Sequence, residues 1–259
     1  MSVVLAPGRS AAFKIIAHRG VLDHASGNTL AAFSDAHRLG VDGVELDVRL
    51  SRDRLPVVHH NWYLDETVPQ PVPIFTLSAA ELRVETVRDD RPEFSRQHPI
   101  PTLEEVLQEF ADKLSLEIEL KSPEPELPAA VAFALAPFRT FWPTIELTSS
   151  STSLLAAVRE RCPGIQTALL LGSTPPYMHM DALAYFAVQS ARLASADVVH
   201  LAPNQLSEEL MATVRASGVD VHVYPVNDEP TLDLISRYRV LEVITDDPVR
   251  TLDLRGSRI

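Results

Sequence analysis

The stretch Gly43-Val44-Glu45-Leu46-Asp47-Val48-Arg49-Leu50 decides how the chain folds. Its apolar residues alternate with Glu45, Asp47 and Arg49, which is typical of a β-strand. Alternate side chains of a strand point to the same face, so Glu45 and Asp47 lie side by side. Two carboxylates on a buried face need a cation or hydrogen-bond donors between them, whereas an exposed edge strand leaves them in water. The stretch by itself leaves both interpretations open.

Strands and helices alternate along the rest of the chain. Eight strands are predicted to begin near residues 14, 43, 114, 144, 166, 197, 220 and 241, and each but the last precedes a predicted helix. Eight such units in 259 residues predict an α/β fold, a (β/α)₈ TIM-type barrel forming a single domain over residues 1–259. The alternative, an open doubly wound sheet, needs a glycine-rich phosphate loop after the first strand, and the sequence has none there. Residues 61–100, which are rich in proline and mixed charges, are predicted to be an insertion.

The composition excludes several classes of partner. A formal charge of −12 disfavours nucleic acid and anionic membrane surfaces. The single cysteine, Cys162, cannot form an internal disulfide. Met1–Arg9 lacks the pattern of a signal peptide, and the apolar run Ala129–Phe138 is too short for a membrane span. We therefore expect a cytoplasmic protein without stable membrane insertion, as a monomer or a homo-oligomer.

Polar residues gather where the predicted strands end, which is where barrels of this class carry their active sites. They are His18, Arg19, Glu45, Asp47, Glu117, Glu119, Lys121, His200, Asn227 and the run Thr245–Asp247. Glu119 and Lys121 share a face just as Glu45 and Asp47 do. Three carboxylates from two neighbouring strands can form an oxygen cage for Mg²⁺ or Ca²⁺. The sequence has no cysteine cluster or close histidine pair that predicts zinc, and His222 has no functional context.

His18-Arg19-Gly20 directly follows the first predicted strand. Histidine exchanges protons near neutral pH, and arginine binds a phosphate through two parallel hydrogen bonds. Gly20 allows the backbone to come close to a ligand. A lone histidine after a strand is more often structural than catalytic, so this feature alone leaves both roles open.

Eight short motifs follow one another from about residue 14 to residue 248. They are Ala17–Gly20, Asn28–Phe33, Gly43–Val48, Pro56–His60, Ile100–Leu107, Ile118–Lys121, Val223–Asn227 and Ile244–Pro248. In this order they resemble the glycerophosphodiester phosphodiesterase family. The cytosolic bacterial members are most similar, because they too carry tyrosine at the position of Tyr224. The resemblance implies a TIM-type barrel with a small insertion after the second histidine motif, which fits residues 61–100.

The resemblance also implies roles for particular residues. It assigns His18 and His60 to acid–base catalysis, Arg19 and Lys121 to phosphate binding, and Glu45, Asp47 and Glu119 to one divalent metal ion. We expect His200 and Tyr224, near the ends of their strands, to line the substrate pocket. The chain departs from the family pattern at Gly27, Asn61 and Ser150, which changes the surroundings of the site but removes no metal ligand or catalytic histidine.

The expected reaction is metal-dependent hydrolysis of a glycerophosphodiester, such as glycerophosphocholine, to glycerol 3-phosphate and an alcohol. The expected cofactor is one Mg²⁺ or Ca²⁺, and the expected partner is a small-molecule phosphodiester of glycerol and lipid metabolism. A first alternative is the same chemistry on a lipid-bearing diester, as in lysophospholipases D. Its apolar groove would come from Trp62, Tyr63, Ile74, Phe75 and Leu77. A second alternative is a barrel that binds phosphodiesters without turnover.

Overall fold

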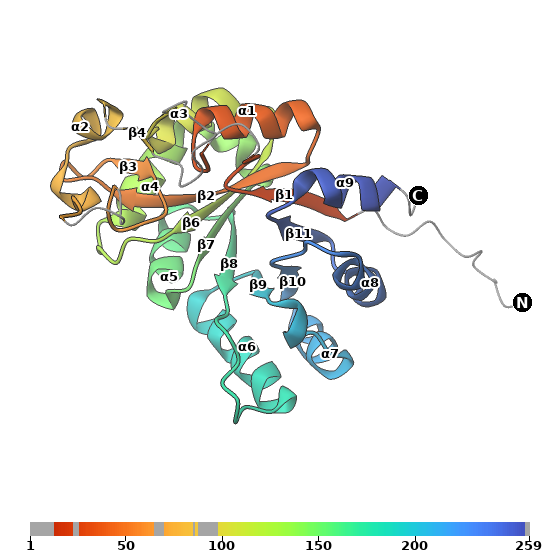
Figure 1. Cartoon of the computed structure of the whole chain (residues 1–259). Helices are drawn as coiled ribbons and strands as arrows, with labels where there is room; N and C mark the ends of the chain where they lie inside the picture. Colours follow the sequence, from red (N-terminus) through yellow and green to blue (C-terminus); the bar gives the residue numbers. More distant parts are fainter. Residues whose placement is uncertain (1–12, 23–25, 65–69, 85, 88–97, 257–259) are drawn as a thin grey trace, which may run out of the picture.

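The computed structural model describes residues 13–22, 26–64, 70–84, 86–87 and 98–256. Within them, eight parallel strands form a closed barrel (Figure 1). The strands are β1 (Lys14–His18), β2 (Gly43–Leu50), β6 (Ser115–Leu120), β7 (Ile145–Ser149), β8 (Gln166–Leu170), β9 (Val198–Leu201), β10 (Asp220–Val223) and β11 (Glu242–Thr245). The order β1-β11-β10-β9-β8-β7-β6-β2 closes where β2 pairs with β1. The predicted (β/α)₈ barrel is confirmed, and the open doubly wound sheet is excluded.

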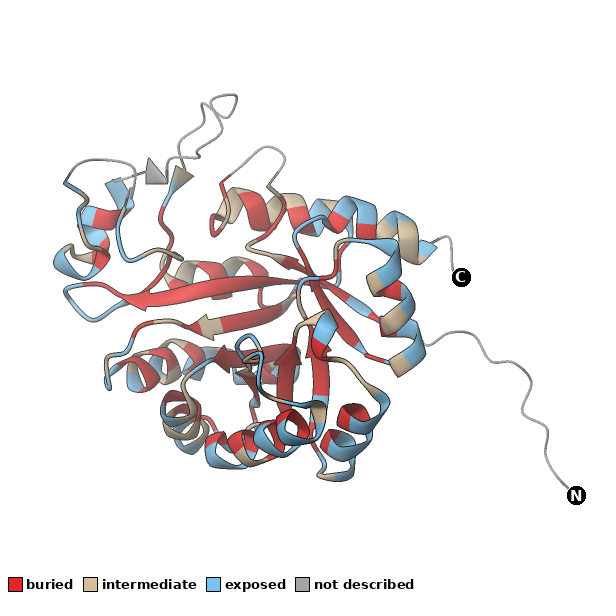
Figure 2. Ribbon diagram, turned by 60° about the horizontal axis from the view of Figure 1, so that its bottom comes forward, coloured by how far each residue is buried: buried red, intermediate tan, exposed pale blue. Residues whose placement is uncertain are grey.

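Helices surround the barrel and turn their buried faces inward, so that exposed residues lie on the outer surface (Figure 2). They are α1 (Leu30–Leu39), α3 (Leu103–Phe110), α4 (Leu127–Leu135), α5 (Thr152–Arg161), α6 (Met180–Ala194), α7 (Glu208–Ala216), α8 (Glu229–Tyr238) and α9 (Pro248–Gly256). The expectation that no helix follows the last strand was wrong. Pro248 begins α9 because the first position of a helix needs no N–H and suits the fixed φ of proline.

The strand that carries Glu45 and Asp47 lies in the middle of the sheet. All eight residues of β2 are buried, and β2 pairs with β1 on one side and with β6 on the other. Gly43 permits this close pairing, since a Cβ there would lie 2.4 Å from the Ser115 carbonyl oxygen. The interpretation of β2 as a solvated edge strand is therefore excluded, and both carboxylates point into the barrel.

Local capping signals fix the loops at the carboxyl mouth of the barrel. Thr29 begins α1 by accepting a hydrogen bond from the N–H of Ala32 at 3.2 Å. Thr102 and Glu105 form a capping box at the start of α3, with hydrogen bonds of 3.2 and 2.9 Å. Thr29 ends the loop after β1, which carries Arg19 and Asn28, and Thr102 ends the segment after β3, which carries His60.

The segment between β3 (Pro56–Val58) and α3 packs partly on itself. It contains η1 (Ile74–Thr76), α2 (Ala79–Val84), β4 (Thr86–Val87) and β5 (His98–Pro99). Ile74 and Leu82 pack with Val57 in a small apolar cluster of their own. Within 77–87, Ala79–Val84 is the helical part of the described residues. The organisation as one domain with this insertion stays a prediction, because residues 65–69, 85 and 88–97 lie outside the described residues.

The remaining expectations concern membranes and the chain start. None of the helices in the described ranges combines the length and apolar character of a membrane span. Residues 1–12, where no signal peptide was predicted, lie outside the described part of the chain.

Candidate active site

Three carboxylates from two adjacent strands meet inside the mouth of the barrel. Glu45 and Asp47 come from β2 and Glu119 from β6, and the register pairs Asp47 with Glu119. One oxygen atom of each lies within 4.8 Å of the others. Burial, and then the neighbouring charges of Asp47 and Glu119, raise the pKa of Glu45 well above its ordinary value. This crowding of negative charge is what a bound cation relieves.

The surroundings of Asp47 also fit a metal ligand. Asp47 is fully buried, and its Oδ1 atom accepts no hydrogen bond from any residue that the structure describes. Its Oδ2 atom accepts one from Asn28 Nδ2 at 2.7 Å. The donor set is three carboxylates, the hard oxygen ligands that Mg²⁺ and Ca²⁺ prefer. Glu45, Asp47 and Glu119 therefore fit a site for one such ion.

Two cationic side chains flank the same carboxylates. Lys121 Nζ lies 2.8 Å from Glu119 Oε2 and 3.3 Å from Asp47 Oδ1, and Arg19 Nε lies 3.1 Å from Asp47 Oδ2. Although burial raises the pKa of Asp47, the charges of Lys121 and Arg19 lower it below its ordinary value. Asp47 is therefore an anion, and both cations lie directly beside the carboxylates.

His18 is oriented by a carboxylate from the last strand's loop. Its Nδ1 atom lies 2.6 Å from Asp246 Oδ1 and 3.1 Å from the Tyr224 hydroxyl. The bond to His18 is the main reason that the pKa of Asp246 falls to about 2. An ionised carboxylate only accepts hydrogen bonds, so Nδ1 carries the proton. The other nitrogen, Nε2, lies 3.8 Å from Glu45 Oε2, on the side of the three carboxylates.

His60 approaches from the loop after β3. Its Nδ1 atom lies 2.5 Å from Asn61 Oδ1, and Arg49 donates two hydrogen bonds to its carbonyl oxygen, at 2.9 and 2.7 Å. Burial lowers the pKa of His60 below its ordinary value. The adjacent His59 turns away, with Nε2 3.0 Å from the carbonyl oxygen of Tyr63. The choice of His60 over His59 thus agrees with the direction of the two side chains.

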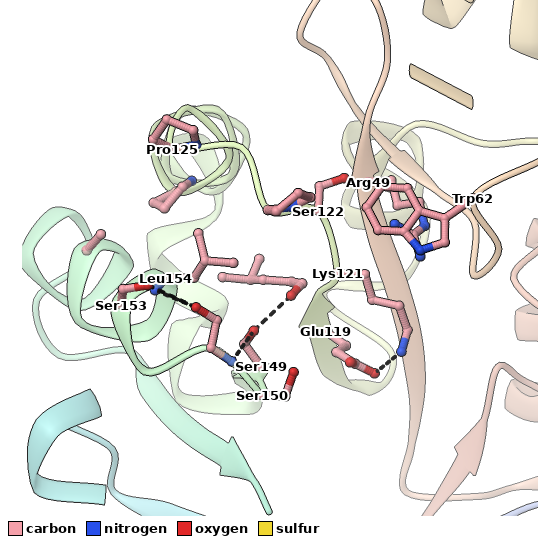
Figure 3. Close-up of a pocket in the computed structure, with 15 residues that line it drawn as sticks. Arg49, Trp62, Glu119, Lys121, Ser122, Pro125, Ser149, Ser150, Ser153 and Leu154 are labelled. Atoms are coloured by element: carbon pink, nitrogen blue, oxygen red, sulfur yellow. Dashed lines mark hydrogen bonds and ion pairs between the residues drawn. The ribbon is translucent and has the colours of Figure 1, made fainter. Parts of the chain in front are cut away.

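Two hollows meet at Glu119 and Lys121. The first, of about 460 Å³, is lined by all the predicted site residues except the buried Asp47: His18, Arg19, Glu45, His60, Glu119, Lys121, His200 and Tyr224. The second, of about 530 Å³, is lined by Arg49, Trp62 and several serines (Figure 3). His200 lines the first hollow together with Glu117, and its Nε2 atom contacts both Glu117 and Glu146.

Two residues of the site, Asn28 and Asp246, were named from the sequence without a functional role. Asn28 was named only as part of the motif Asn28–Phe33, but its side chain holds Asp47 by accepting a hydrogen bond from the Asp47 N–H at 3.1 Å. Its φ of 61° lies in the left-handed region, which asparagine tolerates. Asp246 was placed at the mouth without a role. An acidic residue directly after the last strand was the available signal for a partner of His18.

Groups of this chemistry at the carboxyl mouth of a barrel are those of an enzyme that cleaves phosphate esters. The chain belongs to the glycerophosphoryl diester phosphodiesterase family, whose family model matches residues 18–250. It is therefore a phosphoric diester hydrolase, and the alternative of a barrel that binds without turnover is set aside.

Individual relatives agree with this assignment. YhdW of Bacillus subtilis is 30% identical over 90% of this chain and 94% of its own length. A glycerophosphodiester phosphodiesterase of Caldanaerobacter subterraneus is 28% identical over 93% of this chain and 96% of its own. The structure of an Oleispira antarctica phosphodiesterase in complex with the product sn-glycerol-3-phosphate has a TM-score of 0.78. It is 24% identical, with 94% of this chain and 96% of that chain covered, and shows the likeness of the fold.

Proposed function

We propose that the chain hydrolyses glycerophosphodiesters to glycerol 3-phosphate and an alcohol at the site formed by His18, His60 and the three carboxylates. The observation that carries this proposal is that one hollow is lined by both histidines, both cations and two of the carboxylates. The product sn-glycerol-3-phosphate bound to the similarly folded Oleispira antarctica phosphodiesterase supports this choice of substrate.

The phosphate is held by charges from three strands. Glu45, Asp47 and Glu119 would hold one Mg²⁺ or Ca²⁺, which supplies positive charge against the phosphate oxygens and polarises the phosphorus atom. Arg19 and Lys121 line the same hollow, so we assign them to the phosphate oxygens, where they stabilise the charge of the transition state. Their contacts with Asp47 hold them in position beside the carboxylates.

The two histidines move protons. One takes a proton from the nucleophile, which is a glycerol hydroxyl of the substrate or a water molecule, and the other gives a proton to the leaving alkoxide. Asp246 keeps the proton of His18 on Nδ1 and stabilises the imidazolium that forms when Nε2 takes up a second proton. Asn61 Oδ1 orients His60 in the same way, without a charge.

Asp246→Asn is expected to lower kcat at least about tenfold with little change in KM, because an amide can present its N–H to Nδ1 and favour the wrong tautomer. Steady-state kinetics on one glycerophosphodiester measures both constants. The matched control is Asp247→Asn, since Asp247 caps α9 through the Arg250 N–H at 3.0 Å and has no contact with His18 among its described partners. Equal kcat values for the two variants would remove Asp246 from the mechanism.

The two hollows match the two substituents of a phosphodiester. Both include Glu119 and Lys121, so a phosphate at Lys121 can direct one substituent into each. We assign the alcohol to the second hollow, which Ser150, Ser153 and other serines line (Figure 3). The Arg49 guanidinium lies 4.1 Å from the centroid of the Trp62 ring and covers one face of it. Hydroxyl groups therefore suit this hollow better than a quaternary ammonium group does.

The chain is expected to hydrolyse glycerophosphoglycerol about tenfold more efficiently than glycerophosphocholine, because one or two added hydrogen bonds are worth about 1–2 kcal/mol. The measurement is kcat/KM for both substrates. Ser153→Ala should reduce the ratio of the two kcat/KM values. Ser207→Ala, which changes the N-cap of α7 away from the hollow, should leave this ratio unchanged. A higher kcat/KM for glycerophosphocholine would contradict the assignment of this hollow.

Two of the five residues expected to form an apolar groove for a lipid-bearing substrate do not form one. Ile74 is 1% exposed, and Leu77 packs against the same small cluster, so neither supplies the wall of a groove. Trp62, Tyr63 and Phe75 are exposed. No observation on the described residues specifically favours a lipid substituent over a polar alcohol.

The test of the proposed function is product analysis. The purified chain is incubated with glycerophosphoglycerol or glycerophosphocholine in the presence of Mg²⁺ or Ca²⁺, and the products are identified by phosphorus NMR. We expect glycerol 3-phosphate together with the free alcohol. Release of inorganic phosphate from a monoester, or no product from any glycerophosphodiester in folded protein, would contradict the proposal.

A further inference from the structure

A second cluster of ionisable side chains lies beside the three carboxylates, and the register pairs its Glu117 with Glu45. Glu117 comes from β6, Glu146 from β7, His200 from β9 and His222 from β10. The register pairs Glu117 with Glu146 and His200 with His222, so the four form two pairs of neighbouring residues with β8 between them. They are between 2% and 6% exposed. The proposed reaction uses none of them.

The four side chains converge on one point. His200 Nε2 lies 2.9 Å from Glu146 Oε1 and 3.0 Å from Glu117 Oε1. His222 Nδ1 lies 3.3 Å from Glu146 Oε1 and 3.9 Å from Glu117 Oε1. Bonds of about 2.0–2.2 Å to a tetrahedral metal ion would place the ligand atoms about 3.4 Å apart. The observed separations lie on both sides of that value.

Hydrogen bonds do not satisfy this cluster. His200 Nε2 can carry one N–H, yet two carboxylate oxygens lie within 3.0 Å of it. Neither Glu117 oxygen accepts a hydrogen bond, and His222 Nδ1 makes none, from any side chain or backbone group in the described ranges. Such atoms are costly to bury without a partner. A metal ion at the centre would give a partner to two of these atoms, Glu117 Oε1 and His222 Nδ1, and would also bind His200 Nε2 and Glu146 Oε1.

The formal charges around the cluster also do not balance. Glu146, Glu117 and Glu242 bring three negative charges, since Glu242 Oε1 lies 3.5 Å from His222 Nδ1. Lys14 Nζ, 3.3 Å from Glu242 Oε2, brings one positive charge. Neutrality then requires two more positive charges, which come either from two protons on the histidines or from one divalent cation between neutral imidazoles. The orphaned atoms favour the cation.

We propose that Glu117, Glu146, His200 and His222 form a second metal site, which binds one Zn²⁺-like ion in closed tetrahedral coordination. Two imidazole nitrogens select a transition metal ion over Mg²⁺ or Ca²⁺, in contrast to the all-carboxylate site above. Four protein ligands leave no open position, so the role is structural: the ion ties β6, β7, β9 and β10 together. This inference does not depend on the phosphodiesterase reaction.

Two neighbouring features suit a metal site. Gln166 Nε2 donates a hydrogen bond of 2.7 Å to Glu146 Oε2, which orients the ligand and leaves Oε1 for the ion. Glu117 pairs directly with Glu45 of the first site, so the two sites are neighbours in the barrel. The two sets of ligands share no residue, so each set would hold its own ion.

The first test is the metal content of the purified full chain. After exposure to Zn²⁺ and gel filtration in excess Mg²⁺, elemental analysis should find one Zn²⁺ per chain in the wild type and in Glu119→Gln. His222→Leu should lose it, and His37→Leu, which removes an exposed histidine, should retain it. Two results would overturn the proposal. One is a wild type without bound Zn²⁺, and the other is Zn²⁺ that is lost from Glu119→Gln but kept by His222→Leu.

Two further measurements remain decisive if His222→Leu does not fold. Co²⁺ added to the chelator-treated wild type should give the intense visible absorption of tetrahedral coordination. Weak octahedral bands would overturn the proposed geometry. Gln166→Ala changes an exposed residue and should weaken Zn²⁺ binding about 10–100-fold. Unchanged affinity in that variant would contradict the orienting contact with Glu146.

Discussion

His60→Ala is expected to lower kcat by about 10²–10⁴-fold, the usual contribution of a positioned general acid or base. The structure gives three reasons for this choice. His60 lines the hollow that also contains His18 and Lys121. Its backbone is held by two hydrogen bonds from Arg49, and its Nδ1 atom is held by Asn61, so the ring reaches the hollow in one orientation.

The control for this variant is its neighbour. His59→Gln keeps a side-chain donor within reach of the Tyr63 carbonyl oxygen and leaves the hollow unchanged, so kcat should stay near the wild-type value. His18→Ala should lose as much activity as His60→Ala, and the double variant should lose less than the product of the two, because the pair acts as a unit. Near-normal turnover in His60→Ala, in protein shown to be folded, would refute the acid–base assignment.

Glu119→Gln is expected to lower kcat/KM at least about 100-fold, because it removes one charged ligand from the predicted site for Mg²⁺ or Ca²⁺. A metal ion stabilises the transition state of phosphoryl transfer by several kcal/mol, and each 1.4 kcal/mol corresponds to a tenfold change in rate. Glutamine keeps the shape of the side chain while removing the anion that contacts Lys121 at 2.8 Å. The assay is glycerol 3-phosphate release at increasing Mg²⁺ or Ca²⁺.

Removal of the metal gives the complementary result. Chelator-treated wild type should be inactive and should recover on addition of Mg²⁺ or Ca²⁺, whereas Glu119→Gln should require much higher metal concentrations. Glu104→Gln, an exposed substitution on α3, should behave as the wild type does. Full activity of the chelated wild type would show that Glu45, Asp47 and Glu119 do not act through a metal ion.

The accuracy of the sequence predictions differs between the backbone and the side chains. The eight barrel strands agree with expectation, and the burial of β2 between two strands decides between the two interpretations that the sequence left open. The helix after the last strand was missed, although Pro248 marks its start. Ile74 was expected in a substrate groove and is instead buried, because an apolar residue in an insertion suits a core as well as a groove.

The sequence by itself determined the barrel and the positions of the residues at its mouth. Alternation of apolar and polar residues along Gly43–Leu50 depends only on neighbours in the chain, and it already placed Glu45 and Asp47 on one face. Order along the chain then assigned the ends of the other strands to the same mouth.

Only the tertiary structure decided which of these side chains touch. Asp246 reaches His18, and Asn28 reaches Asp47, through loops whose paths no local pattern specifies. His222 had no functional context in the sequence. In the structure it pairs with His200 on the neighbouring strand and faces two glutamates from across the barrel. The physical reason is that strand register and barrel closure, set by pairing between distant segments, determine which inward-pointing residues share a layer.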